Sequence, residues 1–181
     1  MEERILFAGA GGQGALTLGK FVAQAAMAEH RVTFFPSYGA EVRGGTAHCH
    51  VVIGDAEIAD PVVEEATAMI MMNQASYARF APRMRPDGLL VINSSMVAPE
   101  PHVACGRLLA IPASQRASEM GDIRVANVIL LGAMNAVRPV VSEKSLRRVM
   151  DEKLGGDESK AKLLELNRKA LEVGIEYGRT I

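Results

Sequence analysis

A glycine-rich loop between a short apolar run and an amphipathic helix is the feature that most constrains the fold of this chain. Residues 4–8 (RILFA) have the composition of a buried parallel strand. The loop Gly9-Ala10-Gly11-Gly12-Gln13-Gly14 follows and fits the pattern G-x-G-x-x-G. Residues 14–29 then carry apolar side chains at helical spacing. A strand, a glycine loop and a helix in this order predict the first unit of an α/β domain.

The rest of the chain predicts an alternation of strands and helices. Further strands are expected at residues 31–35, 46–53, 68–72, 88–92 and 107–111, and helices at 73–84, 114–120, 125–137, 142–153 and 158–177. We expect Pro36 to end the strand 31–35, and Pro86-Asp87-Gly88 to form a turn. Residues 125–137 are apolar nearly all round, so this helix either crosses the core or forms a subunit interface. The alternation favours a single α/β domain over residues 1–181, with a Rossmann-like, doubly wound, mostly parallel sheet and helices on both faces.

The glycine loop has two interpretations. Glycines there let backbone N–H groups at a helix N-terminus approach a phosphate, but they also let a helix pack closely on a strand. A dinucleotide site needs in addition a carboxylate at the end of the second strand. That strand ends in Phe34-Phe35-Pro36-Ser37, while Glu29 precedes it and Glu41 lies in the next loop. The sequence therefore disfavours an NAD or FAD site.

A second unusual loop follows the second strand. Pro36-Ser37-Tyr38-Gly39-Ala40-Glu41-Val42-Arg43-Gly44-Gly45 combines a rigid proline, an aromatic ring and two opposite charges with three glycines. This density predicts a loop of fixed shape that presents side chains. Glu41 and Arg43 either form a salt bridge that only shapes the loop or contact a partner, and the residues alone leave both open.

Both loops are expected at the same edge of the sheet. The carboxyl ends of parallel strands share one edge, and ligands bind there. Asn73-Gln74 and Asn93-Ser94-Ser95 follow two further strands and should lie at this edge too. The candidate binding residues are therefore Gly9, Gly11, Gly12, Gln13, Gly14, Ser37, Tyr38, Gly39, Glu41, Arg43, Gly44, Gly45, Asn73 and Asn93.

Composition argues against several classes of protein. The 20 Lys and Arg residues nearly balance the 21 Asp and Glu residues, which disfavours a binder of nucleic acid or of anionic membranes. The longest apolar run, 125–137, is shorter than the ~20 residues that span a bilayer. No signal peptide is recognisable, so we expect a cytoplasmic protein. The two cysteines are too few for the thiolate set of an iron–sulfur cluster.

Metal binding and nucleophilic catalysis are also disfavoured. His48-Cys49-His50 lies on a predicted strand, where side chains alternate, so the two histidines share a face and Cys49 points the other way. We therefore expect no metal site, and a small core residue at Cys49. No G-x-S-x-G elbow occurs, and Ser94 and Ser95 have no evident base nearby, so we expect no catalytic residue in this chain.

The two loops in this order and at this spacing resemble the gamma subunit of 2-oxoacid:ferredoxin oxidoreductases, the family of pyruvate, 2-oxoglutarate and ketoisovalerate enzymes. The resemblance continues through residues 46–53, 58–61, 73–74, 86–88 and 93–95, and covers at least residues 4–139. It implies a role within a larger enzyme. Such enzymes oxidatively decarboxylate a 2-oxoacid with coenzyme A, which gives an acyl-CoA, CO2 and reduced ferredoxin.

The resemblance also implies partners for this chain. Alpha and beta subunits would hold thiamine diphosphate with Mg, and beta and, where present, a delta subunit would hold the iron–sulfur clusters. The chain would bind no cofactor alone, and its predicted edge would face these subunits or coenzyme A, with Arg43 as the expected contact to a phosphate. We expect 2-oxoglutarate as the substrate before pyruvate or a branched-chain oxoacid. Two alternatives remain, a purely structural assembly subunit and a free-standing nucleotide-binding protein.

Overall fold

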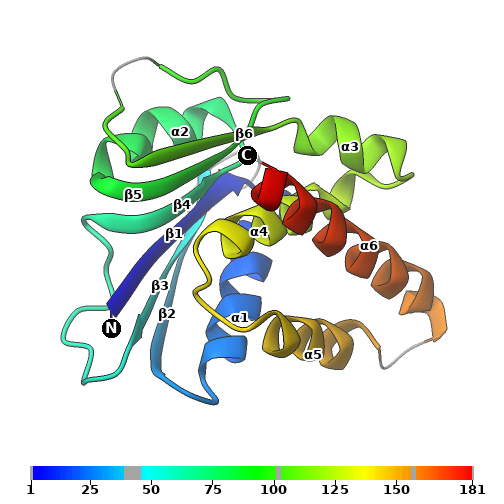
Figure 1. Ribbon diagram of the computed structural model, residues 1–181, viewed down its shortest axis with the longest axis horizontal. Coiled ribbons are helices and arrows are strands. Elements are labelled where there is room, and N and C mark those ends of the chain that lie inside the picture. The colour runs from blue at the N-terminus through cyan, green and yellow to red at the C-terminus, as the bar shows by residue number, and fades with distance from the viewer. Residues whose placement is uncertain (1, 39–45, 101–102, 156–157, 181) are drawn as a thin grey trace.

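The computed structural model describes residues 2–38, 46–100, 103–155 and 158–180. Within them six strands form one sheet in the order β2-β3-β1-β4-β5-β6 (Figure 1). The strands are β1 (Glu2–Ala10), β2 (Arg31–Tyr38), β3 (Thr46–Gly54), β4 (Ala66–Met71), β5 (Met84–Asn93) and β6 (Arg107–Ile111).

The sheet is parallel except for one strand. β1, β4, β5 and β6 pair in parallel, whereas β3 lies between β1 and β2 and runs antiparallel to both. β2 therefore points the same way as β1 without touching it. This confirms the predicted Rossmann-like, mostly parallel fold. It also separates the first two strands, which pair directly in the dinucleotide-binding arrangement.

Helices cover the two faces of the sheet unequally (Figure 1). They are α1 (Ala15–Ala26), α2 (Gln74–Phe80), α3 (Ala113–Glu119), α4 (Ala126–Val137), α5 (Glu143–Leu154) and α6 (Glu158–Thr180), with short 3-10 turns at Ala81–Arg83 and Ile123–Val125. α1, α4, α5 and α6 lie on one face and α2 lies on the other (Figure 1). None of the helices in the described part of the chain is both long and apolar enough to cross a bilayer.

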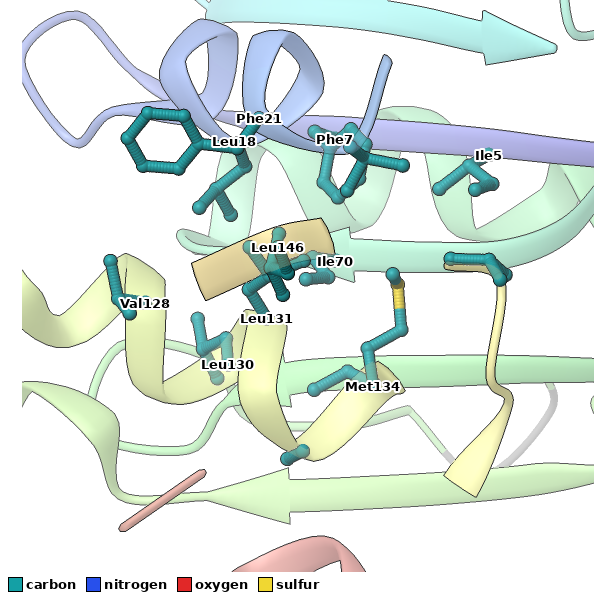
Figure 2. Close-up of a cluster of buried hydrophobic side chains, with 14 of the residues drawn as sticks. Ile5, Phe7, Leu18, Phe21, Ile70, Val128, Leu130, Leu131, Met134 and Leu146 are labelled. Carbon is teal, nitrogen blue, oxygen red and sulfur yellow. The ribbon is translucent and has the colours of Figure 1, made fainter. Parts of the chain in front are cut away.

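The larger core lies between the sheet and the four helices. Figure 2 shows side chains that meet there, from β1, α1, β4, α4 and α5: Ile5, Phe7, Leu18, Phe21, Ile70, Val128, Leu130, Leu131, Met134 and Leu146. α4 is buried from Asn127 to Asn135, since it lies between the sheet and α6. The apolar helix therefore crosses the core of this chain, which decides between the two roles that its sequence allowed.

Two expectations from proline and glycine were wrong. β2 continues through Pro36 to Tyr38, because it is an edge strand and proline is tolerated where no second neighbour needs its N–H. Pro86-Asp87-Gly88 lies inside β5 instead of forming a turn. The β4–β5 register shifts between Ala66 and Ala68, so Pro86 lies in an irregular stretch without a paired residue. Gly88 allows close approach there, since an added Cβ would lie 3.0 Å from the Thr67 carbonyl oxygen.

Candidate functional site

The glycine loop connects the carboxyl end of β1 to the N-terminus of α1, and its glycines fall into two pairs. Gly9 and Gly14 are required for packing: a Cβ on Gly9 would lie 2.8 Å from Oε1 of Gln13, and Gly14 has a φ of 85° and lies against the Asn127 side chain. Gly11 and Gly12 have no non-adjacent atom within 4 Å of an added Cβ. Packing therefore explains the first pair. The second pair faces open space, and of these two Gly12 has a left-handed φ of 90° that also favours glycine.

The Gln13 side chain closes this loop on itself. Its Oε1 accepts a hydrogen bond from the Ala10 N–H at 2.7 Å, and its Nε2 donates to the Met72 carbonyl oxygen at 3.4 Å. The Ala10 N–H is therefore bonded within the chain. An anion at this loop would instead meet the N–H groups in the first turn of α1, which has neither a side-chain cap nor an acidic residue.

α4 begins beside the same loop. Asn127 in its first turn donates from Nδ2 to the Gly14 carbonyl oxygen at 3.5 Å and accepts from the Val128 N–H at 2.8 Å. The N-termini of α1 and α4 are thus neighbours, and their partial positive charges reinforce each other. Asn127 was absent from the residues predicted as candidates. Its only signal in the sequence is its polarity at the start of an otherwise apolar helix.

The two predicted asparagines organise the ends of the neighbouring strands. Asn93 donates from Nδ2 to Oγ of Ser114 at 2.8 Å and thereby joins the end of β5 to the start of α3. Asn73 caps α2, since its Oδ1 accepts from the Ser76 N–H at 2.9 Å. Asn93 lines the pocket at this edge together with Gly12 and Gln13, whereas Asn73 is not part of its lining.

This pocket has a volume of about 170 Å³ and opens where the glycine loop, β5 and the start of α4 meet. Polar groups come from Gly12, Gln13 and Asn127. Met96 and Ile123 add apolar surface, and they are 51% and 59% exposed, which is unusual for side chains of this size. The pocket thus combines positive helix ends with exposed apolar groups.

Arg124 supplies the formal positive charge of the pocket. Its guanidinium group binds the carboxylate of Asp122 at 2.6 Å, and this interaction lowers the pKa of Asp122 to about 2. Arg124 also lines a groove of about 490 Å³ toward α6, which contains Lys162 and Lys169. Lys169 is paired with Glu165 at 2.8 Å. The pocket and the groove therefore share one arginine, and basic side chains continue from the pocket onto α6.

The structure describes only the beginning of the second predicted loop. Ser37 and Tyr38 belong to β2, where they pair with His48 and Ala47 of β3. Gly39, Glu41, Arg43, Gly44 and Gly45 lie outside the described residues. On the far side of that segment Thr46 pairs with Ala10, at the start of the glycine loop. The residues that flank segment 39–45 therefore lie at the same edge as the glycine loop, as the predicted topology requires.

The His48-Cys49-His50 motif has the alternation predicted for a strand. The rings of His48 and His50 lie on one face with centroids 5.4 Å apart, and Cys49 lies in the core on the other face. Burial raises the pKa of the Cys49 thiol to about 12, which keeps it protonated. Among the described residues, no three His, Cys, Asp or Glu side chains gather as metal ligands would.

Comparison with known proteins identifies the family. Residues 4–177 match the family described as pyruvate ferredoxin/flavodoxin oxidoreductase. The chain belongs to this family. It is similar to the gamma subunit of the keto/oxoacid ferredoxin oxidoreductase of Geobacter sulfurreducens, with a TM-score of 0.84 and 27% identity over 99% of this chain and 98% of that one. The resemblance read from the two loops is therefore confirmed.

Some relatives contain this domain as part of a longer chain. Ketoisovalerate oxidoreductase subunit VorA of Methanothermobacter thermautotrophicus is 34% identical over 98% of this chain, which spans only 37% of that protein. The 2-oxoglutarate:ferredoxin oxidoreductase of Magnetococcus marinus, solved with 2-oxoglutarate, coenzyme A and succinyl-CoA bound, gives a TM-score of 0.87 and 26% identity over 99% of this chain and 31% of its own.

Other relatives have nearly the length of this chain. The 2-oxoglutarate synthase subunit KorC of Archaeoglobus fulgidus is 28% identical over 99% of this chain and 90% of its own. Indolepyruvate and pyruvate enzymes also occur among the relatives. The relatives thus share the class of 2-oxoacid substrates but differ in the individual acid.

Proposed function

We propose that residues 1–181 act as one domain, the gamma component of a multi-subunit 2-oxoacid:ferredoxin oxidoreductase in the cytoplasm. The match to a solved gamma subunit from end to end carries this proposal. Alpha and beta subunits, with a delta subunit where the enzyme has one, would hold thiamine diphosphate, Mg and the iron–sulfur clusters. The complex would convert a 2-oxoacid and coenzyme A to an acyl-CoA and CO2, and pass the electrons to ferredoxin.

Within this enzyme, the edge that contains the glycine loop would bind part of coenzyme A. Coenzyme A supplies the thiol that takes up the acyl group, and it carries phosphates, an adenine ring and an uncharged pantetheine arm with methyl and methylene groups between its amides. The residues of the pocket fit such a molecule, because Gly11 and Gly12 leave space beside two helix N-termini, Arg124 adds a positive charge, and Met96 and Ile123 add apolar surface. A volume of about 170 Å³ holds only part of it. This chain would therefore bind and orient coenzyme A together with its partner subunits.

A free-standing dinucleotide-binding protein is a weaker alternative. The carboxylate of such a protein lies at the end of the strand next to β1 and holds the ribose there. In this chain β3 occupies that place and runs in the opposite direction, so the end of β2 is one strand further away. The isolated chain should therefore not bind NAD or FAD.

The contribution to coenzyme A binding can be tested with two arginines in the assembled enzyme. We expect Arg124→Ala, and likewise Arg43→Ala in the second loop, to raise the apparent KM for coenzyme A about tenfold, since each removes a charge-assisted contact. The KM for the 2-oxoacid should stay unchanged. Arg116→Ala is the matched control, because Arg116 is paired with Glu119 as Arg124 is paired with Asp122, but Arg116 does not line the pocket.

The outcome separates a ligand-binding role from a purely structural one. A KM for coenzyme A that stays at the wild-type value in both variants, with normal assembly, would favour a structural subunit. For the substrate we propose 2-oxoglutarate first, with pyruvate or a branched-chain oxoacid such as ketoisovalerate next. The substrate can be identified by assaying a panel of 2-oxoacids on the purified complex. The preferred 2-oxoacid is the one with the highest kcat/KM.

A further inference from the structure

The sheet face opposite the large core carries a surface that the proposed function does not use. Four rings from β2, β3 and α2 follow one another there and form a row that we call the aromatic row. Ring centroids are 6.1 Å apart between Phe35 and His50, 5.4 Å between His50 and His48, and 4.7 Å between His48 and Phe80. Phe35 at the outer end is 44% exposed and belongs to an edge strand. Among the helices of the described residues, only α2 covers this face, and Phe35 at the end of the row is exposed (Figure 1).

Two arginines flank the inner end of the row. The guanidinium carbons of Arg79 and Arg83 lie 5.0 Å and 5.5 Å from the centroid of the Phe80 ring, and both residues are exposed. Within the described residues no carboxylate pairs with either of them, whereas nearby Arg85 is bound to Asp87 at 2.9 Å. A cation near the C-terminus of α2 is favourable, but two like charges beside one ring repel each other. An anion from outside the described residues would relieve this repulsion.

The same face contains buried polar atoms without partners. The His48 side chain is only 7% exposed, and its Nδ1 makes no hydrogen bond of good geometry to a described residue, since the polar contact of the ring with the backbone of Thr46 is a poor one. Thr33 lies on the same face of β2 as Phe35, and its Oγ1 is also buried without a hydrogen bond to a described residue. Two unpaired arginines at one end of the aromatic row and an exposed phenyl ring at the other make this face unlike ordinary protein surface.

We propose that the aromatic row with Arg79 and Arg83 is the docking surface for an acidic segment of a partner subunit. Carboxylates of that segment bind the two guanidinium groups at the inner end of the row, and an apolar side chain further along the segment covers Phe35 at the outer end. The proposal rests on the proposed function in one respect, since the partner is a subunit of the same oxidoreductase.

Charge complementarity and apolar cover together favour a protein as the occupant. Arginine forms bidentate pairs with carboxylates, and arginine and aromatic residues are enriched in interfaces. A phosphate alone would bind the arginines but leave Phe35 exposed. In the longer relatives the domain spans 37% or 31% of a chain, so there it is permanently attached to further protein.

The docking surface can be tested by measuring the affinity of this chain for the other subunits at low and at high salt. Arg79→Gln/Arg83→Gln removes both charges but keeps side-chain stems that can pack on Phe80. We expect the Kd for assembly to rise about tenfold or more at low salt, and its salt dependence to weaken. Arg85→Gln is the matched control and should bind like wild type, because its charge is already paired with Asp87. Unchanged thermal unfolding of each variant shows that the loss is one of docking.

A second variant identifies the partner group directly. In Arg79→Lys/Arg83→Lys, a carbodiimide joins a lysine amine to a neighbouring carboxylate as an amide, while the reagent takes up the released water as its urea. Mass spectrometry of the assembled enzyme should find positions 79 or 83 linked to an Asp or Glu of a partner subunit. Links found only within this chain, or between two copies of it, would overturn the proposal.

Failure of the docking surface and failure of the proposed function look different. A chain that assembles, but whose glutamine variant has the wild-type Kd, overturns the docking surface alone. An equal loss in Arg85→Gln also overturns it, because the effect is then one of net charge. A chain that binds none of the subunits overturns the proposed function and the docking surface with it.

Discussion

Gly14 joins the glycine loop to the core of the molecule, and its backbone has a left-handed conformation. Its φ of 85° and its contact with the Asn127 side chain both require glycine, whereas Gly11 has neither constraint. The sequence motif treats these positions as equivalent, because it records only that each is glycine. The structure distinguishes them, and substitution can therefore separate the part of the loop that maintains the fold from the part that faces a ligand.

We expect Gly14→Ala to lower the free energy of unfolding by about 2 kcal/mol, since it strains the backbone and displaces Asn127. Gly11→Ala should change the free energy of unfolding by less than about 0.5 kcal/mol, because its added methyl group meets open space. Urea denaturation of the isolated variants measures both. Equal losses in the two variants would contradict this division of the loop.

His50 makes a pH-dependent contribution to stability. Burial is the largest cause that lowers its pKa to about 4, followed by the nearby His48 and Arg83. The unfolded chain binds a proton at this residue below about pH 6.5, whereas the folded chain does so only near pH 4. Stability contributed by neutral His50 is therefore present above pH 6.5 and is lost as the pH falls toward 4.

Nδ1 of His50 accepts a hydrogen bond from the Val63 N–H at 3.0 Å. The size of this loss can be measured against His50→Gln, which cannot titrate but keeps an amide oxygen that can accept the same hydrogen bond. Relative to this variant, wild type should lose about 3 kcal/mol of unfolding free energy between pH 7 and pH 4. Chemical denaturation at several pH values gives the difference. A constant difference over this range would mean that His50 titrates normally in the folded chain.

At the scale of elements, period and turn chemistry predicted most strands and helices but not how they pair. The apolar run of β1, the alternation of β3 and the apolar stripe of α6 are local patterns, and the structure confirms the elements predicted from them. The position of β3 between β1 and β2 depends on long-range pairing, which no local pattern contains. The effect of Pro36 was predicted wrongly for the same reason. Proline is tolerated in an edge strand, and the sequence does not show that β2 lies at the edge of the sheet.

α4 and α6 pack through glycines, and this contact should be sensitive to small additions. A methyl group on Gly132 would lie 2.5 Å from the Leu171 carbonyl oxygen, and one on Gly178 would lie 2.7 Å from that of Ala133. We expect Gly132→Ala to lower the free energy of unfolding by about 2 kcal/mol, because the two helices must move apart. The exposed substitution Glu176→Ala on α6 is the control and should be nearly neutral. Thermal or urea unfolding that gives equal stability for both variants would contradict close packing as the function of these glycines.

At the scale of the whole molecule, two surfaces account for what this chain would do in a larger enzyme. The edge with the glycine loop, Asn93 and Arg124 has positive helix ends and exposed apolar groups, and it would contact coenzyme A. The aromatic row with Arg79 and Arg83 lies on the opposite face from the large core and would bind a partner. The sequence predicted the first surface through its glycines and strand ends. It could not predict Asn127, Met96 or Ile123, whose place in the pocket depends on how α4 and the loop after β5 pack.

The most direct test of the central claim compares ferredoxin reduction by the enzyme assembled with and without this chain. We expect the complete complex to reduce ferredoxin only with both a 2-oxoacid and coenzyme A, and this chain alone to be inactive. Omission of the chain should lower the rate at limiting coenzyme A by about tenfold or more, since its binding groups are lost. A complex that lacks the chain and keeps the same kcat and the same KM for coenzyme A would contradict the account.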